Sequence, residues 1–274
     1  MLNFGMRGHD FESDSIETIV SKCKKNSIKN IQLVLKKSIP GFKEGEFSKE
    51  YAKEIGDYFK SHGIGVSVLG CYINPSETNE QQLKNNLNYF IENLYYAKYI
   101  GADVVGLETG FVGDRIDTEQ NESEEAYRHL LKNMRVLCKK AENLNVNIAI
   151  EGVHCFVINT PRKMKRLLDD LNSNNVKVIF DPVNYLNYYN YQNQTEIFKD
   201  FFELLLEKMA VIHLKDFKVE NNNISYEYPC RGMLDKKYIF EMIKKYKPDI
   251  PVILENVTEN MLPIVKEEVL TMYN

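Results

Sequence analysis

Short apolar runs alternate along the chain with longer amphipathic segments. Runs such as VKVIF and PVIL are apolar almost throughout and rich in β-branched residues, as expected for buried strands. The intervening segments, for example 51–59, 87–100 and 127–144, have apolar residues at three-to-four spacing and charges on the opposite face, which predicts covering helices. The predicted strands are 1–6, 30–35, 64–70, 103–108, 146–151, 177–181, 210–215 and 251–255.

Eight strands that alternate with helices predict an α/β fold in which one parallel sheet closes into a (β/α)8 TIM barrel. Strands that are apolar on both faces suit a parallel sheet that is covered on both sides. No linker or shift in composition divides the chain, so residues 1–274 are expected to form a single domain. One segment, 218–231, is too polar to be a barrel helix, and we expect a loop or hairpin near the active-site face.

Composition narrows the function classes. The formal net charge of -4 argues against a surface built to follow a nucleic-acid backbone. No apolar run approaches the roughly 18 residues of a spanning helix, so we expect no membrane insertion. The 5 cysteines include no CxxC pair, and the N-terminus lacks the layout of a signal peptide, which predicts a cytoplasmic protein.

Four potential metal ligands stand at the ends of four successive predicted strands: Glu151, Asp181, His213 and Glu255. The carboxyl ends of parallel barrel strands meet on one rim, where active sites of this fold lie. Any one of these residues could simply cap a strand or helix, but four in register favour a site for one divalent ion. Three carboxylates and one imidazole suit Mn²⁺, Mg²⁺, Co²⁺ or Zn²⁺.

Other polar residues near this rim are weaker candidates for binding substrate, and for each an ordinary role in a turn or loop is equally open. Lys215 and Arg231 could supply a fixed positive charge near bound oxygens or near a phosphate or carboxylate. The remaining candidates are Asn184, His154, Glu108, Tyr72 and His9.

The runs IAIEG, IFDPVN, VIHLKDF and VILEN, together with LGCYINP and VVGLETG, resemble the sugar phosphate isomerase/epimerase superfamily of xylose isomerase-like barrels. The resemblance covers nearly the whole chain. It implies that Glu151, Asp181, His213 and Glu255 bind one divalent ion, and that Glu151 and Glu255 are the catalytic acid/base pair. It also implies a small-molecule carbohydrate substrate, and homo-oligomers are common in the family, although no feature of this sequence specifies an interface.

The implied chemistry is proton abstraction beside a metal-chelated carbonyl, through an enediolate. Return of the proton to the same carbon gives epimerisation, and return to the former carbonyl carbon gives isomerisation. A dehydratase or lyase of the inosose dehydratase kind shares the first step and stays open as the alternative. An endonuclease IV type of DNA-repair enzyme fits less well, because Asn184 stands where that family has a histidine. A non-enzymatic sugar-binding barrel would be favoured only if the ligand set were broken.

Overall fold

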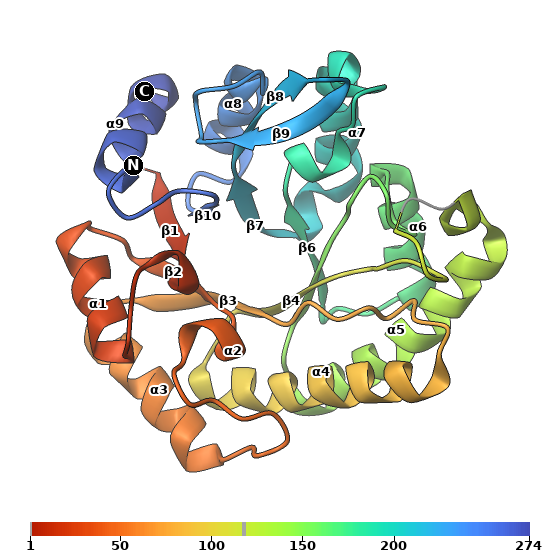
Figure 1. Ribbon diagram of the computed structural model, residues 1–274, viewed down its shortest axis with the longest axis horizontal. Coiled ribbons are helices and arrows are strands. Elements are labelled where there is room, and N and C mark those ends of the chain that lie inside the picture. Colours follow the sequence, from red (N-terminus) through yellow and green to blue (C-terminus); the bar gives the residue numbers. More distant parts are fainter. Residues whose placement is uncertain (1, 117–118) are drawn as a thin grey trace.

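Eight parallel strands close into a barrel in the computed structural model, which describes residues 2–116 and 119–274. Figure 1 shows the strands around a central space with the long helices outside them. Around the barrel the order is β1-β10-β7-β6-β5-β4-β3-β2, which confirms the predicted TIM barrel. The strands are β1 (Asn3–Arg7), β2 (Asn30–Leu33), β3 (Gly65–Gly70), β4 (Val104–Glu108), β5 (Ile148–Glu151), β6 (Val176–Phe180), β7 (Met209–Leu214) and β10 (Pro251–Leu254).

These bounds agree with the predicted runs to within a few residues, except that Met1 lies outside the described part of the chain. Side chains that point into the barrel form a small apolar core of their own. The helices pack their apolar faces against the outside of the sheet in a larger core. The inner core comprises Val68, Val104, Ala149, Ile179, Val211 and Ile253.

The helices start and end at local sequence signals. The hydroxyls of Ser48 and Thr160 accept hydrogen bonds from backbone N–H groups in the first turns of α3 and α6. Gly101 ends α4 with a φ of 79°, a left-handed conformation in which glycine is unstrained. The helices are α1 (Ile16–Lys25), α2 (Leu35–Ser38), α3 (Lys49–Ser61), α4 (Glu80–Ile100), α5 (Glu124–Leu144), α6 (Pro161–Leu171), α7 (Gln194–Leu205), α8 (Lys236–Tyr246) and α9 (Leu262–Tyr273).

A two-stranded antiparallel hairpin follows β7 and is separate from the barrel sheet. It consists of β8 (Asp216–Glu220) and β9 (Asn223–Glu227), and it appears in light blue beside α7 and α8 in Figure 1. Asp216 anchors the base of the hairpin: its side chain accepts from the backbone N–H of Leu234 and pairs with Lys236 at 2.8 Å. The hairpin is therefore tied to the start of α8.

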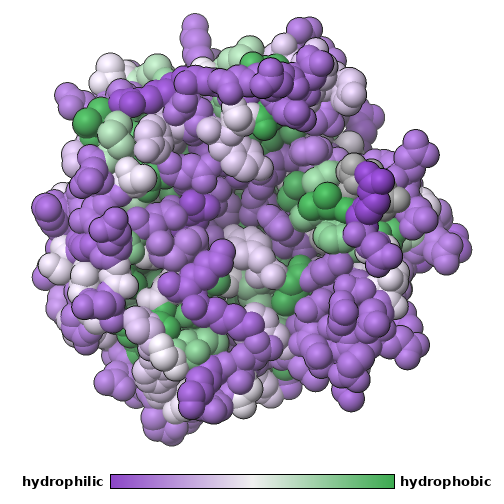
Figure 2. Space-filling model, in the orientation of Figure 1, coloured by the Kyte–Doolittle hydropathy of each residue, from purple (hydrophilic) through white to green (hydrophobic). Residues whose placement is uncertain are grey.

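The face of the molecule seen in Figure 2 is mainly hydrophilic, with scattered hydrophobic patches. No helix in the described ranges is both long and apolar enough to cross a bilayer.

Candidate metal centre and cavity

The strand register brings the candidate ligands to one level of the barrel rim. Glu108 on β4 is paired with Glu151 on β5, and Phe180, which precedes Asp181, is paired with Ile212, which precedes His213. Because these strands run parallel and side by side, their carboxyl ends place the side chains around the same space.

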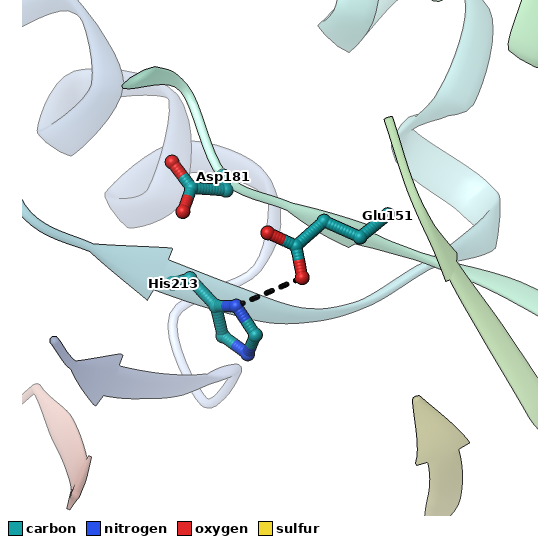
Figure 3. Close-up of side chains that lie close together, drawn as sticks. All are labelled: Glu151, Asp181 and His213. Atoms are coloured by element: carbon teal, nitrogen blue, oxygen red, sulfur yellow. Dashed lines mark ion pairs between the residues drawn. The ribbon is translucent and has the colours of Figure 1, made fainter. Parts of the chain in front are cut away.

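Glu151, Asp181 and His213 converge in Figure 3, each from a different strand end. Each offers one ligand atom, and the three atoms lie within 4.8 Å of one another. Among the described residues, this is the only group of three or more His, Cys, Asp or Glu side chains at such spacing. All three are buried. A three-zinc cluster of the endonuclease IV type needs further groups of ligands, and the described residues contain no second group of this kind.

Glu255, the fourth predicted ligand, lies at the edge of this group. Its Oε1 is 3.4 Å from Nδ1 of His213, and its Oε2 is 3.2 Å from Nζ of Lys215. Lys215 in turn donates to Oδ2 of Asp181 at 2.5 Å. A buried ammonium group thus connects Asp181 to Glu255, whereas His213 lies between Glu255 and Glu151.

Burial and neighbouring charges give the carboxyl groups of the site different pKa values. Burial, with Glu151 adding to it, raises the pKa of Glu108 to about 8. Burial also raises the pKa of Asp181 to about 6, even though Lys215 opposes the shift. For Glu255, burial is outweighed by Lys215 and His213, and the pKa falls to about 2. At neutral pH and without a bound ion, Glu255 is therefore ionised, whereas Glu108 is mostly protonated.

His213 fits a metal ligand because both of its ring nitrogens are buried and have no hydrogen-bond partner in the described part of the chain. Nδ1 lies 3.2 Å from Oε2 of Glu151, close enough for attraction but without the geometry of a hydrogen bond. Burial lowers the pKa of this imidazole, but the carboxylates Glu151 and Glu255 outweigh that effect and raise it to about 9. The carboxylates of this buried cluster favour a positive charge, and the imidazole nitrogens have no hydrogen bond, so the cluster suits a divalent ion.

A cavity of about 430 Å³ borders the cluster at Glu151, and Glu255 and Lys215 also line it. Asn184 lines it and donates to Oε1 of Glu151 at 2.6 Å, which fixes that carboxylate. Tyr226, on β9, also lines the cavity and lies over Lys215, whose Nζ is 4.8 Å from the centre of the ring. The hairpin thus forms part of the cavity wall. Six of the weaker candidates line the cavity: Lys215, Asn184, His154, Glu108, Tyr72 and His9.

Arg231 is the one weaker candidate that does not line the cavity. Its guanidinium group pairs with Glu268 on α9, at 2.8 Å, where both side chains are about one-third exposed. In this structure the ion pair holds Arg231 away from the cavity, at α9.

Sequence reasoning missed several residues of the cavity wall. Arg7 is the last residue of β1 and Asn256 follows the last ligand motif, so the rule that strand ends form the site could have found both. Gln32 lies inside a strand and Lys37 belongs to a short helix, positions with no motif of their own. Tyr226 gave no signal either, because its place depends on how the hairpin folds back.

The comparison with protein families decides the classification. A family model described as xylose isomerase-like TIM barrel matches residues 15–272. The chain belongs to this family. A search of curated proteins found no match.

Solved structures share the fold at low sequence identity. D-psicose 3-epimerase with D-tagatose from Clostridium cellulolyticum H10 superposes with a TM-score of 0.73 at 15% identity, over 99% of this chain and 98% of that one. The probable 3-DHS dehydratase AsbF from Bacillus anthracis gives 0.76 at 14% identity, over 100% and 99%. The IolI protein with a binding zinc atom gives 0.75 at 15% identity, over 99% and 98%. At such identity these matches establish the shared barrel and leave the reaction open.

Proposed function

We propose that this family member is a divalent-metal-dependent isomerase or epimerase of small carbohydrates. The observation that carries the proposal is the buried cluster of Glu151, Asp181 and His213, with Glu255 beside it, which borders the cavity through Glu151 and Glu255. A bound ion there would polarise a substrate carbonyl and stabilise the negative charge that develops when the neighbouring C–H bond loses its proton.

We assign the proton transfer to two glutamates, Glu151 and Glu255. Glu151 ends β5 and Glu255 follows β10, and two strands separate these in the barrel order, so the carboxylates approach from different directions. Asn184 holds Glu151 by a hydrogen bond, whereas Lys215 holds Glu255. One carboxylate would take the proton from carbon, and the other, in its protonated form, would return one from the opposite side.

The test is solvent proton exchange into ketoses in deuterated water, with Mn²⁺ added and with each sugar followed by NMR. We expect deuterium to enter the carbon beside the carbonyl, and both Glu151→Gln and Glu255→Gln to reduce the exchange rate at least a hundredfold. Glu268→Gln is the matched control, because this glutamate pairs with Arg231 outside the cavity.

The products distinguish the competing reactions. An inverted centre next to the carbonyl indicates epimerisation, and an aldose indicates isomerisation. A product lighter by one water would instead place the protein with the dehydratases. Normal exchange in either of the two glutamine variants would overturn the acid/base assignment.

A further inference from the structure

The cavity has a second polar end, across the barrel from the metal cluster. The cluster lies on β5, β6 and β7, whereas β1 and β2 lie on the other side of the ring (Figure 1). Arg7, His9, Gln32 and Lys37 line the cavity there, and we call these four residues the β1–β2 subsite.

Two buried polar atoms of the β1–β2 subsite lack hydrogen-bond partners among residues 2–116 and 119–274: Nδ1 of His9 and Oε1 of Gln32. The other end of the Gln32 amide is held in place, because its Nε2 donates to the hydroxyl oxygen of Tyr72 at 2.7 Å. Buried polar groups usually have partners, and those that lack one in a cavity are suited to contact a polar ligand. The subsite is thus chemically incomplete without an occupant.

The charges of the subsite leave one lysine unbalanced. Arg7 donates to Asp10 from Nε at 2.7 Å and from Nη2 at 3.1 Å, and its Nη1 lies 3.6 Å from Oε1 of Glu255, so carboxylates already balance its charge. No carboxylate in residues 2–116 or 119–274 forms an ion pair with Lys37, which is exposed at the cavity wall. The preceding Lys36, by contrast, pairs with Glu44.

The metal end has no charge to spare for a second anion. Lys215 contacts Asp181 and Glu255, and Arg7 lies 3.6 Å from Glu255, so the cations at this end are already paired with the carboxylates that would hold a divalent ion. The unbalanced positive charge of the cavity therefore lies at Lys37. Burial first, and then the charges of Arg7 and Lys37, lower the pKa of His9, so its ring is neutral and can make a hydrogen bond at neutral pH.

We propose that the β1–β2 subsite binds a terminal oxyanion of the substrate, a phosphate or a carboxylate, so that the substrate is an acidic sugar derivative. Lys37 supplies the charge, His9 contacts an oxygen of the anion, and Oε1 of Gln32 accepts from a neighbouring hydroxyl. The cavity of about 430 Å³ has room for a sugar chain between this subsite and the cluster. This assignment of substrate class rests on the proposed function, but the anion site can be tested without it.

The first experiment measures anion binding directly. Inorganic phosphate and, separately, acetate are titrated by calorimetry into metal-free protein, so that no ion at the cluster can bind them. We expect Lys37→Met to weaken binding of the preferred anion about tenfold, the effect of losing one charge-assisted hydrogen bond. Lys36→Met should bind like the wild type. Equal affinity in all three proteins, or no binding of either anion to the wild type, would overturn the subsite.

The second experiment connects the subsite to turnover. The ratio of kcat/KM for a ketose 5-phosphate, or for a keto sugar acid, to that for the free ketose is compared between wild type and Lys37→Met. We expect the ratio to fall about tenfold for the anion that the titration selects. If no ketose exchanges but anion binding still depends on Lys37, the proposed function fails and the subsite stands. If ketoses exchange and the ratio is unchanged, the subsite fails alone.

Discussion

Replacement of Lys215 by methionine tests whether the cavity floor requires a positive charge. Lys215 is 4% exposed and its ammonium group contacts two carboxylates, at 2.5 Å from Asp181 and 3.2 Å from Glu255. Methionine retains an unbranched apolar side chain but removes the charge. Asp181 then loses the ammonium group that it contacts, whereas Glu255 keeps His213 at 3.4 Å and Arg7 at 3.6 Å. Removal of one partner from a buried ion pair typically costs about 3–5 kcal/mol.

We therefore expect Lys215→Met to lower the free energy of unfolding of the metal-free protein by about 3 kcal/mol at pH 7. The pKa of Lys215 is raised above its usual value, because the attraction of the carboxylates outweighs burial. The stabilising contribution of this lysine is therefore complete below its unfolded-state pKa of 10.5 and is lost only at higher pH, as pH rises through the folded-state pKa. Measurements at pH 7 therefore report the full contribution of Lys215 to the free energy of unfolding.

The assay is urea denaturation followed by circular dichroism, in EDTA and again with excess Mn²⁺. A divalent ion supplies the missing positive charge, so Mn²⁺ should stabilise the variant more than the wild type. Lys218→Met is the control, because Lys218 pairs with Glu227 on the exposed hairpin, where solvent screens the pair and its contribution to stability is small. A loss in Lys215→Met no larger than in this control would refute the reasoning.

Three further changes probe the surroundings of the site. Burial raises the pKa of Glu108 to about 8, so the metal-free protein should lose stability as pH rises from about 4.5 to 8, by on the order of 3–5 kcal/mol. Glu108→Gln should remove this loss, measured by urea denaturation at the two pH values. Parallel pH profiles of the wild type and the variant would contradict this prediction. In Gly152→Ala the new Cβ would lie 2.4 Å from the Tyr185 hydroxyl oxygen, so the free energy of unfolding should fall by about 1–3 kcal/mol. An unchanged urea midpoint would contradict this close packing. Asp216→Asn should loosen the hairpin by weakening the contact with Lys236, and hydrogen exchange should become faster in β8 and β9; unchanged protection would argue against the anchor.

The barrel could be predicted from the chain because its signals are local. Each strand is a short apolar run and each helix has an amphipathic face, so the eight units and their order follow from hydrophobic pattern alone. The rule that parallel strand ends share a rim then points to Glu151, Asp181 and His213, which the structure brings together.

What could not be predicted depends on side chains that reach across the barrel. Sequence reasoning allowed Lys215 to pair with a ligand carboxylate, but its simultaneous contact with Asp181 and Glu255 depends on rotamers that sequence spacing does not record. Arg231 was a weak candidate for substrate binding because of its fixed positive charge, but in the structure it pairs with Glu268 on α9. Contacts between residues far apart in sequence carry no local signal.

The central claim is that Glu151, Asp181 and His213 bind one divalent ion, and elemental analysis of protein purified without a metal-binding tag tests it most directly. After dialysis against metal-free buffer and reloading with Mn²⁺, we expect about one ion per chain. His213→Ala should hold much less, whereas His154→Ala, which alters a histidine of the cavity wall outside the cluster, should hold as much as the wild type. No bound metal in the reloaded wild type, or equal content in wild type and His213→Ala, would contradict the account.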